Sequence, residues 1–218
     1  MAYRSSSIVS LATAASVAPT VPTGTAANDI VVVCVYIENN TKTITPPSGF
    51  TQKYGPDSIT AEHHTYWFWK RPTGSDTGSY TFSWTGAEPC QAVAVAFSGR
   101  ITTGDPFHAS SDMKTLASGT AFPNLSVTAD ANSDAVAMYS TWTSQGLTPP
   151  TGFTTRQNVN EIGIATLDNI AGGTQAANSA SWGASSSLVD RLATLLVAGA
   201  APKSLLVPRN SMAHMIVR

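Results

Sequence analysis

Short runs of β-branched and aromatic residues, separated by clusters of Gly, Pro, Asn and Ser, recur along the whole chain. The strongest run, residues 30–37, is apolar at almost every position, which predicts a central strand covered on both faces. Tyr80, Phe82 and Trp84 alternate with polar residues, as expected of a half-buried strand. In residues 92–97, valine and phenylalanine alternate with alanine. This patterning predicts an all-β fold.

Residues 65–70 are the aromatic centre of the first half. Side chains alternate along a strand, so Tyr66 and Phe68 point to one face and Trp67 and Trp69 to the other. We expect both faces to be buried. The alternative is that an exposed aromatic pair stacks on sugar rings.

One motif occurs twice. Residues 45–50 read Thr-Pro-Pro-Ser-Gly-Phe, and residues 148–153 repeat them with Thr151 in place of Ser48. Each copy follows a run that reads as a strand, residues 30–37 and 135–142, and other signals recur in the same order. A fixed period of this kind indicates that one β unit is used twice.

The Pro-Pro motif predicts a rigid loop at the rim of the fold. Both prolines fix φ and lack an amide donor, and Gly49 permits a backbone conformation that other residues avoid. We expect the loop to hold Phe50 against the core. A binding loop is the functional alternative.

The second half repeats this scheme with fewer aromatic residues. Strands are expected at residues 125–128, 135–142, 162–167, 177–182 and 188–198, and only the last run could instead be a helix. Residues 99–120, rich in Gly, Ser and Thr, should link half-repeats at about 20–100 and 120–200.

Neither half carries enough apolar residues to close a core comfortably by itself. We therefore predict one jelly-roll-like β-sandwich over residues 1–200, rather than two immunoglobulin-like domains. Residues 7–11 read as an N-terminal strand and not as part of a signal peptide, because Ser and Thr dilute the apolar run there.

Composition narrows the classes of partner. The net charge of the 218-residue chain is −1, whereas nucleic-acid binding requires a basic surface. No apolar run approaches the roughly 20 residues that span a bilayer. Cys34 and Cys90 are expected to be buried free thiols, although a disulfide is possible, and no Cys or His pattern predicts zinc. No cofactor is expected.

Candidate catalytic residues do not form a persuasive set. Glu62, His63 and His64 precede the aromatic strand, and they are expected to be an exposed strand entrance. Asp76 and Asp105 are expected in turns. Sugar hydrolysis needs two carboxylates, but the sequence does not single out a pair. The possible acids are Glu38, Glu62, Glu88, Glu161 and Asp168.

Residues 201–218 have no counterpart in the first half and form a predicted extended C-terminal arm. The segment contains three basic residues and no acidic residue. We expect it to dock on a neighbouring subunit as an added strand. Alternatively, it could fold back on its own sandwich. A third alternative is that residues 206–209 are a protease site left by an expression vector, which they resemble. The candidate assembly contacts are Leu205, Leu206, Val207, Arg209, Met212, Met215, Ile216 and Arg218.

Several segments together resemble a group of tailed-bacteriophage structural proteins, in which a Pro-Pro-x-Gly-Phe/Trp-Thr motif follows the first strong strand. The resemblance covers roughly residues 20–200. It rests on Val-Pro-Thr-Gly-Thr-Ala-Ala-Asn-Asp-Ile-Val-Val-Val (21–33), Thr-Pro-Pro-Ser-Gly-Phe-Thr (45–51), Trp-Lys (69–70), Tyr-Thr-Phe-Ser-Trp (80–84) and Val-Ala-Val-Ala-Phe-Ser-Gly (93–99). It implies a minor tail, fibre or capsid-surface component and carries over no catalytic residue.

We therefore expect a non-enzymatic virion protein, made in the host cytoplasm, that acts as capsid decoration, cement or tail appendage. Its partners would be other virion proteins and copies of itself. The alternative is a receptor- or carbohydrate-binding module that contacts a host surface glycan, with Trp67, Trp69, Trp84 and Trp142 as candidate stacking aromatics. A polysaccharide-degrading enzyme is a third possibility.

Overall fold

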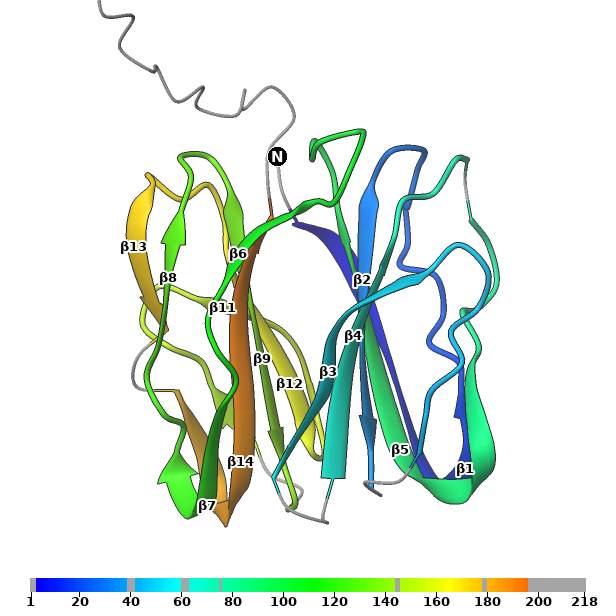
Figure 1. Ribbon diagram of the computed structural model, residues 1–218, viewed down its shortest axis with the longest axis vertical. Coiled ribbons are helices and arrows are strands. Elements are labelled where there is room, and N and C mark those ends of the chain that lie inside the picture. The colour runs from blue at the N-terminus through cyan, green and yellow to red at the C-terminus, as the bar shows by residue number, and fades with distance from the viewer. Residues whose placement is uncertain are drawn as a thin grey trace, which may run out of the picture.

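Two antiparallel β-sheets face each other in the computed structural model, and the chain completes the first before it begins the second (Figure 1). The structure describes residues 3–38, 42–59, 63–74, 76–143, 146–177 and 180–195. The first sheet has the strand order β1-β5-β2-β4-β3. Its strands are β1 (Tyr3–Val17), β2 (Ile30–Ile37), β3 (Thr51–Ile59), β4 (His63–Lys70) and β5 (Phe82–Phe97).

The second sheet has the order β10-β14-β9-β12-β11, with β6 and β7 also paired to β14. A separate two-stranded sheet, β13-β8, lies outside it. These strands are β6 (Phe107–Ser110), β7 (Lys114–Ala121), β8 (Leu125–Ala129), β9 (Asp134–Thr141), β10 (Leu147–Thr148), β11 (Thr154–Val159), β12 (Ile162–Leu167), β13 (Gly173–Ala177) and β14 (Ser181–Leu195). Among the described residues, no helix is long and apolar enough to cross a membrane.

The prediction of an all-β sandwich is confirmed, but jelly-roll connectivity is not. All strands of the first sheet come from one stretch of chain and all strands of the second from the next, whereas the chain of a jelly roll alternates between its sheets. Residues 99–120 link the two halves, and they also contain β6 and most of β7, which pair with β14.

Five strands of the second sheet repeat the pairing order of the first. The first sheet, β1-β5-β2-β4-β3, corresponds strand by strand to β7-β14-β9-β12-β11. Thr45 bridges Ser83, and Thr148 pairs with Ser181 at the same point of the other half. The glycines of the repeated motif, Gly49 and Gly152, have φ angles of 84° and 86°.

The core between the sheets is built from their inner faces. It contains alternate residues of β2, β4 and β5 together with residues of β9 and β12. Trp67 contributes from β4, and Val136 and Met138 from β9, all fully buried. Strand β2 has every side chain buried, which confirms a central strand covered on both faces.

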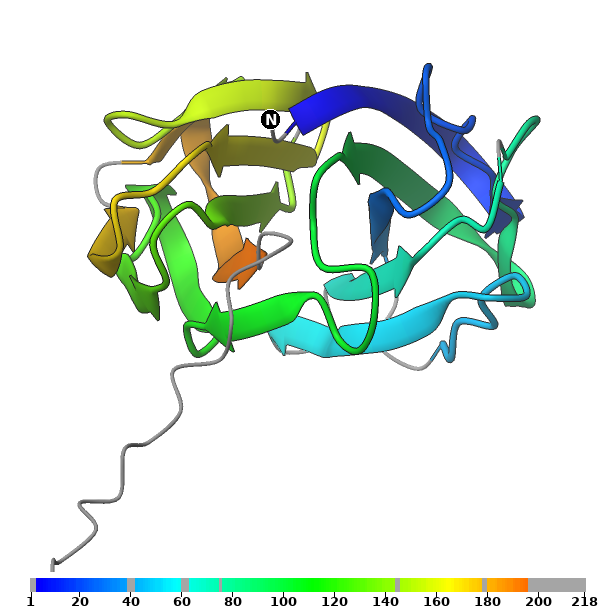
Figure 2. The same ribbon diagram turned by 90° about the horizontal axis from the view of Figure 1, so that it is seen from above.

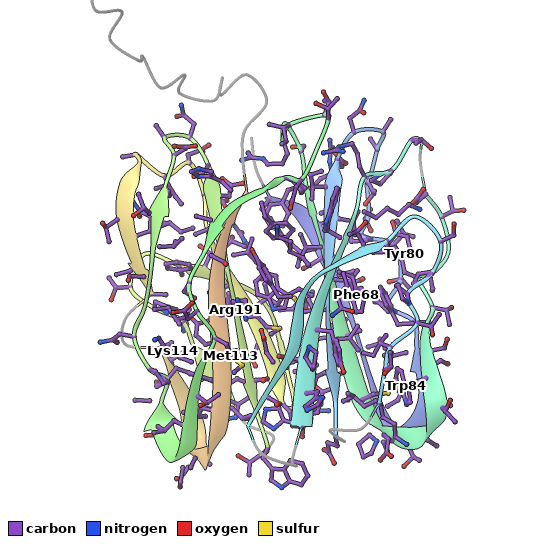
Figure 3. The ribbon with its side chains drawn as sticks, viewed as in Figure 1. Phe68, Tyr80, Trp84, Met113, Lys114 and Arg191 are labelled. Carbon is purple, nitrogen blue, oxygen red and sulfur yellow. The ribbon has the colours of Figure 1, made fainter. Side chains whose placement is uncertain are left out.

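The outer face of each sheet carries a further core. Tyr66 and Phe68 pack there on the first sheet, as the alternation predicts, beneath Tyr80, Phe82 and Trp84. Figure 3 shows Phe68, Tyr80 and Trp84 in this part of the molecule. The outer face of the second sheet is covered by β8 and β13, with Phe122 and Trp182. Both faces of each sheet are therefore shielded from water.

The flanks of the sandwich are closed by contacts between edge strands. Seen from above, β1 lies beside β11 on one flank, and β3 lies beside β7 on the other (Figure 2). The guanidinium of Arg156 on β11 lies 3.9 Å from the centroid of the Tyr3 ring on β1. Gln157 donates a hydrogen bond to Ser6, with a nitrogen–oxygen distance of 2.9 Å.

Candidate functional site

Three rings form a stack where β2 and β9 end. The centroids of Tyr36 and His63 lie 5.2 Å apart at an interplanar angle of 30°. The centroids of His63 and Trp142 lie 6.5 Å apart at 28°. Trp142 is 43% exposed, whereas Tyr36 and His63 are fully buried. The stack therefore runs from the inter-sheet core to the surface and presents one aromatic side chain to solvent.

His63 is held in its neutral form by its surroundings. Burial, with a smaller contribution from the charge of His64, lowers the pKa of His63 from 6.5 to about 4. Its Nε2 lies 3.3 Å from the hydroxyl oxygen of Ser140. The expectation that His63 and His64 form an exposed strand entrance is wrong: they are 0% and 7% exposed, because β4 lies between β2 and β3.

Three of the candidate catalytic acids, Glu38, Glu88 and Glu161, lie close enough for their charges to affect pKa values. Burial raises the pKa of Glu38, and the charge of Glu88 raises it further. Burial also raises the pKa of Glu161, with an added contribution from Glu38. Glu88 is paired with Lys42 at 3.1 Å. The described residues contain no group of three or more His, Cys, Asp or Glu arranged to hold a metal ion.

The four tryptophans nominated as ligand platforms differ in accessibility. Trp67 is fully buried and Trp84 is 8% exposed, so neither can offer a ring face to a ligand. Trp69 is half-buried, and the guanidinium of Arg71 lies 5.4 Å from its ring centroid. Trp142 is the nominated residue whose side chain the structure leaves most open.

An ion pair that joins the two sheets was missed by sequence reasoning. Arg191 on β14 donates two hydrogen bonds of 2.7 Å to the carboxylate of Asp57 on β3. Its guanidinium also lies 4.5 Å from the centroid of Tyr54. The side chain of Asp57 is 5% exposed. Figure 3 shows Arg191 between the two layers. The partners are 134 residues apart in sequence, and no local pattern connects them.

A second ion pair lies where the chain passes from the first sheet to the second. Arg100 follows β5 and lies 3.3 Å from the carboxylate of Asp134, and both side chains are almost completely buried. Asp134 also accepts a hydrogen bond from the backbone N–H of Asn169 at 3.0 Å. Burial raises the pKa of Asp134, although the Arg100 charge acts in the opposite direction. The pair fixes the start of β9 against the end of β5.

The remaining nominated aspartates also make structural contacts. Asp168 pairs with Arg156 at 2.7 Å. Asp76 pairs with Lys70 at 2.7 Å and accepts a hydrogen bond from Tyr80. Asp105 pairs with Lys53 and accepts the backbone N–H of Phe107, as a turn aspartate does.

The prediction of buried free thiols is confirmed. Cys34 and Cys90 are 0% and 1% exposed, and both are free. Burial raises the pKa of both thiols, that of Cys90 to about 11. Glu62 lies outside the described residues, as do the predicted arm and its candidate contacts Leu205, Leu206, Val207, Arg209, Met212, Met215, Ile216 and Arg218.

Comparisons with protein-family models, with curated proteins and with solved structures found no significant match for this chain.

Proposed function

We propose that the chain is a non-enzymatic structural protein of a bacteriophage virion. It assembles with other virion proteins as capsid decoration, cement or tail appendage. The proposal takes its source class from the resemblance of residues 20–200 to tailed-phage structural proteins. The arrangement of the charged side chains supports its structural role.

The observation that carries the proposal is that these charges hold the scaffold together. Arg191–Asp57 joins the two sheets, Arg100–Asp134 fixes the crossover between them, and Arg156–Asp168 stabilises the β11 flank. A catalytic acid or base must reach a proton of its substrate, whereas these carboxylates already bind guanidinium groups. Such an arrangement suits a rigid building block.

Antibody-gold labelling of intact particles from the source culture, viewed by electron microscopy, tests the proposal. Gold over the head supports decoration or cement, and gold over the tail supports an adaptor or fibre. Particles without gold would overturn the virion role, provided that the same antibody labels the purified protein adsorbed to a grid.

A receptor- or carbohydrate-binding module is the second candidate, and one observation favours it. Trp142 presents an exposed ring on a firm base of His63 and Tyr36, and a rigid aromatic ring can stack on a sugar face. A glycan array probed with the wild type and Trp142→Ala tests this role. Leu116→Ala, which removes another exposed apolar side chain from β7, is the matched control. Binding that survives Trp142→Ala would exclude this site.

A further inference from the structure

Within the described part of the chain, strand β1 has a hydrogen-bonded partner strand on one side only. Among the described strands it pairs with β5 alone, at the edge of the first sheet. Ser5 to Leu11 pair without interruption with Ala96 to Cys90, and register irregularities lie only beyond these seven residues. An edge of this length exposes a row of N–H and C=O groups that can pair with another strand.

The other long edge strands are protected against such pairing. Strand β3 contains Lys53, Pro56 and two register irregularities. Strand β11 contains Arg156 and an irregularity beside it. Strand β7 contains Lys114 and Gly119, and its pairing with β14 is twice interrupted. Charges, proline, glycine and bulges are the devices that keep edges apart.

The segment from Ser5 to Leu11 has none of these devices. It reads Ser-Ser-Ser-Ile-Val-Ser-Leu, without charge, proline or glycine. We propose that this segment pairs antiparallel with the same segment of a second copy of the chain, about a twofold axis at Ile8. Centring the axis on Ile8 pairs all seven residues, and the two first sheets become one continuous sheet.

Side chains on β1 suit this pairing. The register places Ser6 opposite Ser10, Ser7 opposite Val9, and Ile8 opposite its own copy. β-branched pairs stabilise antiparallel strands, and no like charges meet. The hydroxyls of Ser6 and Ser10 already bond to Arg156 and Asn160, so they only have to be accommodated. Leu11, which is 37% exposed, lies opposite Ser5 of the second copy and gains a cross-strand neighbour.

The second sheet also leaves room for a second copy of the chain to approach β1. Strand β11 lies on the same flank as β1, and Asn160 beside it donates a 2.7 Å hydrogen bond to Ser10 (Figure 2). A twofold axis perpendicular to the sheets keeps each layer in its own plane, so β11 approaches its own copy. Arg156 is already neutralised by Asp168, and this approach adds no unpaired charge.

This self-contact does not depend on the virion role, because it follows from the edge of β1 alone. Sedimentation velocity of the full chain over a range of concentrations tests it. We expect a reversible species of twice the 22.7 kDa chain mass. Ser5→Lys/Leu11→Lys places lysine opposite lysine twice, and should raise the dissociation constant by at least about tenfold. Ser5→Lys/Leu11→Glu at the same positions places lysine opposite glutamate and should keep the dimer.

A wild type that stays monomeric, or a double-lysine variant that dimerises as tightly as wild type, overturns the proposal. Amide hydrogen exchange of the wild type gives a test that needs no variant. Alternate amides of residues 5–11 bond to β5, and the others face outward. The outward amides should become protected as concentration rises. Protection that is already complete in the monomer would mean that another segment of the chain occupies the edge, and would also overturn it.

Discussion

At the scale of single residues, strand order decides what the sequence cannot. His63 opens a strand, and its two polar neighbours in sequence suggest an exposed position. Because β4 lies inside the sheet, between β2 and β3, the ring is buried against Tyr36. Trp142 was one of four nominated tryptophans, and only packing shows that its side chain reaches solvent while Trp67 does not. The sequence identifies the candidate residues, but strand pairing between distant segments determines which of their side chains are exposed.

His63 predicts a loss of stability in mild acid. Its pKa falls from 6.5 to about 4 on folding, so the unfolded chain binds more protons between these values. Stability therefore rises with pH across that window and is lost as the pH falls from about 6.5 towards 4, by up to about 3 kcal/mol. Urea unfolding at a series of pH values measures this. His63→Phe, which keeps a ring against Tyr36, should flatten this part of the profile, and an unchanged slope would contradict the assignment.

The Arg191–Asp57 pair predicts a marked asymmetry between single and double substitutions. Asp57→Asn leaves the guanidinium of Arg191 without its counter-charge between the sheets and should cost about 3 kcal/mol in the free energy of unfolding. Replacing both partners, Asp57→Leu with Arg191→Met, should recover much of that loss because no charge remains buried. Denaturant unfolding of Asp57→Leu, Arg191→Met and the double variant measures the coupling. Additive losses would show that the pair does not act as a unit.

At the scale of elements, the apolar runs with the strongest local pattern predict strands that the structure contains. The apolar run at residues 30–37 is β2, and the run at 162–167 is β12. The sequence pattern predicts the bounds of long strands less well. Residues 82–97 form one strand, although Gly86 and Pro89 interrupt its sequence pattern, because β1 pairs with it on either side of Gly86. Likewise, the run expected at 177–182 belongs to two strands, β13 and β14. A partner strand far away in sequence can maintain a strand that local patterning divides.

The repeated rim loop gives a prediction at this scale. Gly152 has a φ of 86°, and Phe153 after it is 7% exposed and donates a backbone hydrogen bond to Pro150. Gly152→Ala should lower the free energy of unfolding by about 1 kcal/mol, since a side chain strains this conformation. Chemical denaturation measures the loss. Gly74→Ala is the control, because Gly74 has an ordinary φ and open space around its Cα. Equal effects at both positions would contradict the role of the loop.

At the scale of the whole molecule, the sandwich is an association of two similar sheets. Five strands of the second sheet follow the pairing order of the first, and each sheet contributes its inner face to one shared core. The repeat in the sequence favoured two units, but it could not show that each unit forms a complete sheet. That distinction depends on the pairing of β5 with β2 and of β14 with β9. These strands are far apart in sequence, so a local pattern cannot predict that they pair.

This arrangement predicts how the chain behaves when it is divided between the sheets. Separation at residues 104 and 105, in the turn between Phe97 and Phe107, would leave β1 to β5 in one fragment and β6 to β14 in the other. Each fragment alone would expose large inner-face side chains, such as Trp67 in the first and Met138 in the second, which are fully buried in the intact fold. An exposed apolar patch of this size drives association.

The two fragments, produced together, should therefore co-purify as a 1:1 complex, and each alone should aggregate or self-associate. Arg191→Met in the second fragment removes its ion pair with Asp57 and should weaken the complex, whereas Thr128→Ala, at an exposed position of β8 in the separate two-stranded sheet, should not. Size-exclusion chromatography with light scattering measures both outcomes, and a folded, monomeric first fragment would contradict the shared core.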